Sequence, residues 1–205
     1  MIHFKNLTII GTSHIARESI EEVKLIFHSE KPEIVALELD MNRFHALLNP
    51  QPHKIRVKDI LSIGIKSWVL NLVGSWAEAK MGKVVGVKPG SEMKTAIMLA
   101  SQNKTKIVLI DRDIRITLKR LTKEITWKEK FRFLADILNA VIFRKAPEIN
   151  FDLSKVPSQK LIDELMGKVK KRYPNVYKVL VHERDVYMAK ALNTLINTEK
   201  DKKVV

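Results

Sequence analysis

The sequence predicts an α/β protein in which a mostly parallel or mixed central sheet is flanked by helices. Short runs of apolar residues, typical of strands covered on both faces, alternate with stretches of helical periodicity. Two of these runs, Leu7–Ile10 and Ile107–Ile110, each end in a polar cluster that leads into a helical pattern. The first strand, helix and second strand are also spaced as a parallel pair with a right-handed crossover.

The length and composition fit a single cytoplasmic domain. We assign residues 1–205 to one domain with helical insertions at about 55–82 and 123–172. The apolar fraction of 45% and the charged fraction of 29% are ordinary for a globular protein. The absence of cysteine excludes a disulfide framework, a thiolate nucleophile and a cysteine-based metal site, and it suits a reducing compartment. The first residues open directly into a strand, so we expect no secretory signal.

The chain is strongly basic, with a formal net charge of +14. Such a charge permits nucleic acid, anionic lipid or acidic substrates as partners. The basic residues are spread along the chain, however, and the three tryptophans lie in apolar patterns, so we do not expect nucleic-acid binding. The longest apolar stretch, residues 60–77, contains too many polar residues to span a membrane. We expect it to be buried or to form a homodimer surface, and membrane association would need segments outside this sequence.

The first unit consists of a strand at about Lys5–Ile10, a helix at about Ala16–Ser29 and a strand at Ile34–Leu39. A glycine, two hydroxyl residues and His14 follow the first strand, at the corner where open α/β sheets place their binding crevices. Alternatively, Thr12 or Ser13 caps the helix and His14 is a solvated residue of its first turn.

Glu38 is the only acid in the second strand. A buried carboxylate costs several kcal/mol unless it is paired or coordinated, and in a parallel pair Glu38 would lie beside the corner at His14. The alternative is an ordinary exposed acid at the strand end. Arg43 follows on a short helix that starts near Asp40, where it is either an anion clamp or a plain surface residue.

The middle of the chain predicts helices, a possible strand and a second polar cluster. Residues 60–80 are typical of an amphipathic helix or helix pair, and residues 82–87 of a strand or extended segment. Gly90 or Ser91 would cap the next helix, and Glu92 in its first turn either supports the helix dipole or points into the crevice. A confident strand, residues 106–110, then ends in Asp111, Arg112 and Asp113.

Three strand ends therefore carry polar residues at one edge of the predicted sheet. Further helices are predicted at residues 127–143, 157–169 and 176–196, and residues 202–205 resemble the beginning of another strand. This convergence is a stronger argument for a site than any single residue.

Five ordered sequence blocks match the pattern of one known family. They are Gly11-Thr12-Ser13-His14; Leu37-Glu38-Leu39 with Arg43; Pro89-Gly90-Ser91-Glu92-Met93; Asp111-Arg112-Asp113 with Thr117-Leu118-Lys119-Arg120; and Glu183-Arg184-Asp185 with Met188-Ala189. On these blocks, residues 7–190 resemble the TraB/PrgY family, the pheromone-shutdown group related to the Tiki proteins. The resemblance implies an α/β fold similar to erythromycin-esterase and ChaN proteins, and a site centred on histidine and glutamate.

The resemblance has one departure. The family pattern carries a second Gly-x-x-His on the strand after the last long helix, whereas here only His14 follows a glycine by three positions. We therefore expect this chain to hold only part of the site. Family members often continue into membrane-spanning segments, so a longer form would be membrane-associated.

The first functional hypothesis is a metal-assisted hydrolase that acts on a peptide or a similar small-molecule amide. His14 and Glu38 would bind a divalent ion such as Mn, Co or Zn, which would activate water. Arg112 or Arg43 would stabilise the developing oxyanion, and a metal-free variant would use His14 as the base. The second hypothesis is a non-catalytic, possibly dimeric module that binds a peptide or protein. The candidate substrate-binding residues are Ser13, Arg43, Glu92, Asp111, Glu183 and Arg184.

Overall fold

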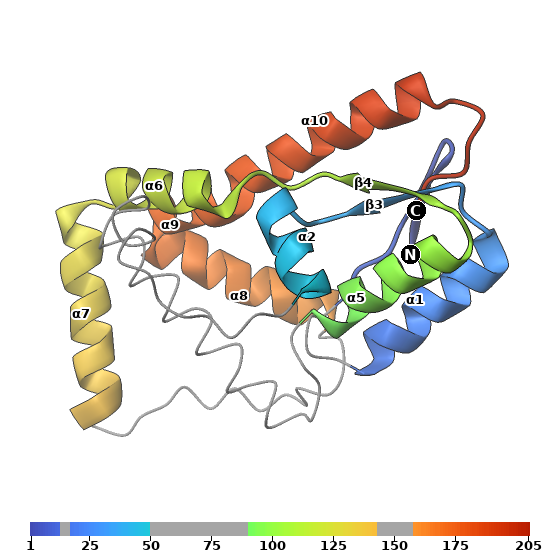
Figure 1. Ribbon diagram of the computed structural model, residues 1–205. Helices are drawn as coiled ribbons and strands as arrows, with labels where there is room; N and C mark the ends of the chain where they lie inside the picture. Colours follow the sequence, from blue (N-terminus) through green and yellow to red (C-terminus); the bar gives the residue numbers. More distant parts are fainter. Residues whose placement is uncertain (13–16, 50–89, 143–157) are drawn as a thin grey trace.

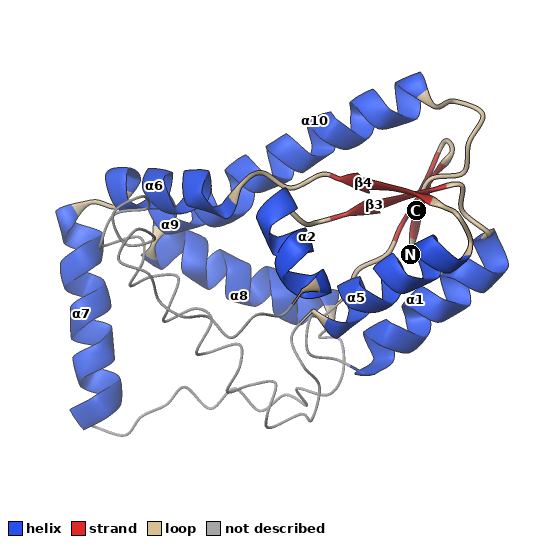
Figure 2. Ribbon diagram, in the orientation of Figure 1, coloured by secondary structure: helices blue, strands red, loops and turns tan. Residues whose placement is uncertain are grey.

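The computed structural model describes residues 1–12, 17–49, 90–142 and 158–205 (Figure 1). Within these ranges the protein is a mixed α/β structure, which confirms the predicted fold class (Figure 2). The predicted helices at 60–80 and the extended segment at 82–87 lie outside the described residues, as do Ser13 and His14. The described elements are β1 (Ile2–Phe4), β2 (Leu7–Ile9), α1 (Arg17–Glu30), β3 (Ile34–Leu37), α2 (Met41–Leu48), α5 (Ser91–Gln102), β4 (Lys106–Leu109), α6 (Ile114–Glu124), α7 (Trp127–Ile142), α8 (Gln159–Arg172), α9 (Pro174–Tyr177), the π-helix η1 (Lys178–His182) and α10 (Glu183–Thr198).

The sheet is built from two strand pairs joined by the last residues of the chain. β1 and β2 pair antiparallel, whereas β3 and β4 pair parallel, with Ile34 opposite Lys106. Val204 bridges to Leu7 of β2 and to Ile34 of β3, parallel to both. Residues 203–205 therefore lie between β2 and β3.

This position corrects one expectation. The spacing of the first unit predicted that β2 and β3 pair directly, so that Glu38 would lie beside the corner after β2. β2 and β3 are parallel, but residues 203–205 lie between them. The distance from β2 to β3 is therefore two inter-strand spacings, or about 10 Å. A right-handed crossover is equally compatible with adjacent and with separated strands, so the spacing of the first unit does not distinguish them.

Helices cover both faces of β3, as its continuous apolar sequence predicted. Val35 and Leu37 point into a cluster with Val23 and Phe27 of α1 and with residues of α5. The alternate residues of β3 and β4 point to the other face, where Leu195 and Ile196 of α10 pack with Ile34, Ala36, Val108 and Val204. The molecule thus has three layers, with α1 and α5 on one face of the strands and α10 on the other (Figure 1).

The N-terminus differs from the single strand predicted at Lys5–Ile10. It forms a hairpin in which β1 and β2 are joined at Lys5 and Asn6, and Lys5 adopts a left-handed backbone with φ 54°. The Asn6 side chain donates to the carbonyls of Glu199 and Lys202, each at 2.8 Å, and so ties the turn to the end of the chain.

Beyond β4 the described elements from α6 to α10 are all helical, and the end of α10 returns to the sheet. The predicted helix at 176–196 is a nearly continuous run of α9, η1 and α10 that starts at Pro174. Its π-helical turn η1 contacts α6, and Val179 in that turn is fully buried. Single π turns within α-helices occur frequently at functional sites.

Candidate functional site

The carboxyl ends of β3 and β4 carry two aspartates that organise the local backbone. Asp40 is buried and accepts hydrogen bonds from the backbone N–H groups of Asn42 (2.8 Å) and Arg43 (3.1 Å) as the N-cap of α2. Asp113 caps α6 through the N–H of Arg115 at 2.8 Å, and the Arg115 guanidinium lowers the pKa of Asp113. Because N-caps satisfy donors that lack helical partners, these two acids fix where both helices begin.

Asp111 is the centre of a first ion-pair cluster. Its carboxylate is almost fully buried and accepts from Arg184 of α10 at 2.6 Å and from Arg43 of α2 at 3.4 Å. Burial alone would lower the pKa of Arg184, but the hydrogen bonds and charge of Asp111 outweigh it, and the pKa is raised. Glu38 contributes to the same shift through its charge. Three predicted substrate-binding residues, Asp111, Arg184 and Arg43, therefore do lie together.

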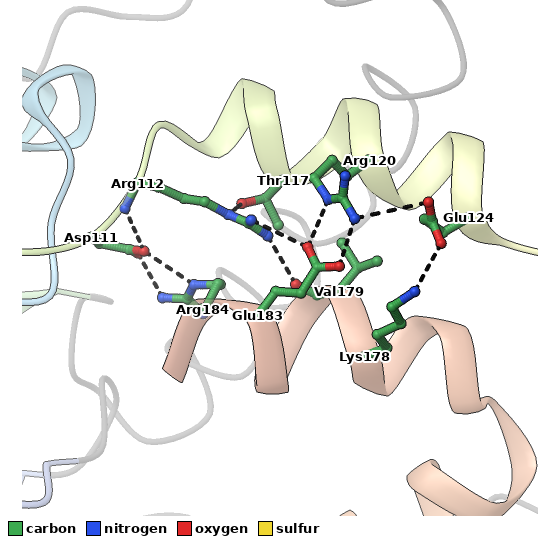
Figure 3. Close-up of polar contacts among 9 residues, drawn as sticks. All are labelled: Asp111, Arg112, Thr117, Arg120, Glu124, Lys178, Val179, Glu183 and Arg184. Atoms are coloured by element: carbon green, nitrogen blue, oxygen red, sulfur yellow. Dashed lines mark hydrogen bonds and ion pairs between the residues drawn. The ribbon is translucent and has the colours of Figure 1, made fainter. Parts of the chain in front are cut away.

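Arg112 belongs to a second cluster beside the first (Figure 3). Its guanidinium donates to Thr117 (2.9 Å), to Glu183 (3.3 Å) and to the carbonyl of Val179 in η1 (3.1 Å). Glu183 also accepts two hydrogen bonds of 2.7 Å from Arg120. These bonds outweigh the opposing effect of burial and lower the pKa of Glu183 to about 2. All three nitrogens of the Arg112 guanidinium are thus engaged in holding η1 and α10 against α6.

Glu38 is exposed, which corrects the expectation that it is buried in its strand. β3 ends at Leu37, and the alternation continues beyond that end, so that Leu37 and Leu39 point inward and Glu38 points outward. Glu38 nevertheless lines a cavity of about 120 Å³ between β2 and β3, together with Thr12 and Glu92.

The walls of this cavity are apolar on both faces of the sheet. Val23, Phe27, Met93 and Ala96 lie on the side of α1 and α5, and Leu192 lies on the side of α10. Glu92 is buried in the first turn of α5, where the partial positive charge of a helix N-terminus favours a carboxylate. Glu92 is among the residues that line the cavity, and its predicted role in substrate binding stays a prediction.

Strand edges of β2 and β3 face each other across the same cavity. The N–H of Thr8 donates to the Val204 carbonyl at 2.9 Å, and the N–H of Ala36 donates to the Val205 carbonyl at 2.7 Å. Because N–H and C=O groups alternate along a strand, the N–H groups of Ile10 and Glu38 point the same way, two residues further along. Thr12, Ile10 and Val205 also line the cavity.

A second cavity, of about 650 Å³, lies at the opposite edge, where β3 and β4 begin. Lysines 24, 31, 104, 106 and 202 line it. Since sites in parallel sheets form at the carboxyl ends of strands, we centre the candidate site on the smaller cavity. Within the described residues no three His, Cys, Asp or Glu side chains are grouped closely enough to hold a metal ion.

Sequence reasoning missed three residues of this region. An aspartate before a helical pattern is an N-cap signal for α2, but no sequence pattern shows that the Asp40 carboxylate also accepts a hydrogen bond of 3.4 Å from the N–H of Ile114 at the start of α6. Arg120 and Thr117 belong to one of the matching sequence blocks, but the bond from Arg120 to Glu183 joins α6 to α10 across 63 positions. Thr117 accepts from Arg112, which lies five residues earlier and just before α6. No sequence spacing fixes the longer of these contacts.

These features define an α/β domain with a polar site at the carboxyl edge of its parallel strands. The chain belongs to the TraB/PrgY/gumN family, which its sequence matches over residues 2–205. It is 39% identical over 192 residues to the uncharacterized protein MJ1365 of Methanocaldococcus jannaschii, covering 91% of this chain and 47% of that protein. It is also 24% identical over 191 residues to a human TraB domain-containing protein, covering 88% of this chain and 50% of that protein.

The chain spans about half the length of the curated relatives it matches. The activity, substrates and partners of a whole protein of this family are therefore proposals for this chain. The relationship to Tiki, erythromycin-esterase and ChaN proteins stays a prediction.

Proposed function

We propose that this domain binds a peptide in extended conformation at the carboxyl edge of its sheet and hydrolyses it with the help of a divalent metal ion. The observation that carries the proposal is the cavity between β2 and β3, which combines facing strand edges with two carboxylates, Glu38 and Glu92. Extended peptides add to such edges through backbone hydrogen bonds, and apolar walls accept their alternate side chains.

The metal-binding part of the proposal rests on the chemistry of the donors. Glu38 lines the cavity, and His14 follows two positions after Thr12, which also lines it, although His14 itself lies outside the described residues. Either both side chains would be ligands, or His14 would be the ligand and Glu38 the general base. A carboxylate and imidazole set suits Mn, Co or Zn. A bound ion of this kind would lower the pKa of water toward neutrality.

The residues of this chain would divide the remaining work. Glu38, exposed at the mouth of the cavity, would hold the attacking water and accept its proton. Within the described part of the chain, Arg43 forms a single ion pair, with Asp111, which is long at 3.4 Å, whereas the guanidinium of Arg112 is fully engaged. Arg43 is therefore the better candidate for stabilising the oxyanion. Ser13 and Glu92 would contact the peptide, while Asp111, Glu183 and Arg184 would position the edge.

The test is a cleavage assay in which the full chain is incubated with a mixture of unstructured peptides and with Mn²⁺, Co²⁺, Zn²⁺ or a chelator. Mass spectrometry detects the cleavage products. We expect metal-stimulated cleavage that His14→Ala and Glu38→Gln abolish and that Glu21→Gln, an exposed carboxylate on α1, leaves intact. If His14→Ala binds metal and cleaves peptide as well as the wild type, the proposal is wrong.

A second candidate function is peptide or protein binding without hydrolysis. It is favoured by the ion-pair clusters, in which Asp111, Arg112, Glu183 and Arg184 are bound to one another and to their neighbours. Saturable peptide binding with no cleavage under any metal would select it. Light scattering on the same samples tests the homodimer expected for such a module.

A further inference from the structure

Helix α7 is attached to the molecule through its polar side. Glu129 is buried and accepts from the backbone N–H of Asn175 at 2.8 Å and from the side-chain amide of Asn175 at 2.9 Å. Seven residues, or about two helical turns, further along α7, Asp136 is bound by Arg172 and by the Tyr173 hydroxyl, which lower its pKa to about 2. The acids of α7 are therefore turned toward α8 and α9.

The opposite side of α7 is an exposed apolar stripe. Trp127, Phe131 and Leu134 are four and three residues apart, the spacing that places side chains on one face of a helix. Their exposed fractions are 70%, 65% and 51%. Glu129 and Asp136 each lie two residues from a member of the stripe. Because each residue turns the helix by about 100°, two residues place a side chain on the opposite side of α7. An ordinary surface helix has the reverse arrangement, with its apolar face inward.

Lysines flank the stripe. Lys128 and Lys130 are neighbours of Trp127 on either side of the stripe, and the Lys130 ammonium lies 4.5 Å from the centre of the Trp127 ring. Lys123 is exposed near the end of α6, four residues before Trp127 in the sequence. The remaining acid of this region, Glu124, is paired with Lys178 at 3.2 Å. The stripe thus presents apolar and cationic groups together.

We propose that this stripe docks the protein on an anionic lipid surface. Helices with Trp, Phe and Leu on one face and lysines beside them lie in the plane of the membrane interface, where lysine stems reach back toward the headgroups. A second copy of the chain would bring the same lysines together on a molecule of net charge +14, and that repulsion opposes self-association. Nucleic acid would engage the lysines but would leave an aliphatic residue such as Leu134 without a role.

The proposal concerns surface contact only. Among the helices of the described ranges, none has both the length and the apolar character needed to cross a bilayer. It is also independent of the proposed hydrolysis, because α7 contributes no residue to the cavity between β2 and β3.

Vesicle co-sedimentation of the full chain tests the proposal. We expect binding to vesicles of phosphatidylcholine with phosphatidylserine, little binding to phosphatidylcholine alone, and release by salt. Trp127→Ser with Phe131→Ser should weaken binding by roughly tenfold or more, because about two large apolar side chains leave the interface. Trp127→Phe keeps the stripe and should bind like the wild type.

Leu25→Ser provides the matched control, because Leu25 is 68% exposed on α1, outside the stripe. Circular dichroism and an unchanged melting temperature show that the variants fold. Equal binding to neutral and anionic vesicles, or an equal loss in Leu25→Ser, overturns the proposal. So does a dimer that the Trp127 and Phe131 substitutions dissolve, or protection of Trp127 from acrylamide quenching in the free protein.

Discussion

The bond between Glu183 and Arg120 makes a quantitative prediction for the substitution Glu183→Gln. The carboxylate accepts two hydrogen bonds of 2.7 Å from Arg120 and one of 3.3 Å from Arg112. Glutamine retains the size of the side chain but removes the charge that both arginines face. We expect the folded state to lose stability because these hydrogen bonds are charge-assisted.

The magnitude follows from the lowered pKa. A carboxyl group whose pKa falls from 4.5 to about 2 on folding contributes at most ~3 kcal/mol by linkage. The Glu183 side chain is 17% exposed and that of Arg120 is 41% exposed. Solvent screening therefore reduces the expected loss to about 1–2 kcal/mol, or roughly 2–8 °C in melting temperature for a chain of this size.

The pH dependence has a definite sign. Because folding lowers the pKa of Glu183, its contribution is present above the ordinary value of 4.5 and is lost as the pH falls toward about 2. Urea unfolding of the wild type and of Glu183→Gln should therefore differ near neutral pH and converge in acid. Glu164→Gln is the control, because that exposed carboxylate pairs only with Lys168 on the surface of α8. Equal stability of wild type and Glu183→Gln at neutral pH, or a difference that persists in acid, would refute the reasoning.

Four further substitutions test other parts of the structure by thermal or urea unfolding. Asp111→Asn leaves the Arg184 guanidinium beside a neutral group in a buried position and should cost about 2–4 kcal/mol; a loss below the error of measurement contradicts the cluster. Gly90→Ala should destabilise by about 1–2 kcal/mol, because φ is +78° and a Cβ would lie 3.0 Å from Leu47, whereas Gly167→Ala in the open interior of α8 should stabilise by about 0.5–1 kcal/mol. Val204→Ala removes methyl groups between β2 and β3 and should cost about 1–2 kcal/mol, with faster amide exchange at Thr8 if its bond to Val204 weakens.

The sequence predicted β3 and β4 well because both are runs of apolar residues with apolar contacts on both faces, a condition that continuous apolar residues signal by themselves. β3 is largely buried, whereas β4 is only partly buried. It predicted the hairpin of β1 and β2 poorly. Two-residue hairpin turns are usually marked by Asn-Gly or Asp-Gly, and here a left-handed Lys5 precedes Asn6. The bonds from Asn6 to the last turn of the chain stabilise that turn and have no local signature.

The candidate site was predicted in its parts but not in its connections. The strand ends identified Glu38 and Asp111 as residues of one edge, and Arg43 on the following helix was either an anion clamp or a surface residue. The structure places Arg43 against Asp111. The burial of Glu38 was predicted from its apolar neighbours. β3 ends at Leu37, however, one residue before Glu38, and the Glu38 side chain is exposed. Trp127 was assigned to an apolar pattern, although it begins a stretch rich in lysine and arginine, and the helix turns its apolar side to solvent.

The two ion-pair clusters explain how a distant helix acts on the sheet edge. Asp111 and Arg112 are consecutive residues, yet Asp111 binds Arg184 and Arg112 binds Glu183, which are themselves consecutive on α10. In one ion pair the acid follows β4 and the base is on α10, and in the adjacent pair the charges are reversed. A shift of one residue along either segment would bring like charges together, so the two pairs allow only one alignment of these segments. Buried ion pairs add little net stability compared with apolar contacts, but they can specify one arrangement among several. We therefore interpret the clusters as the element that fixes where Arg43 and the mouth of the cavity lie, and not as the reacting groups themselves.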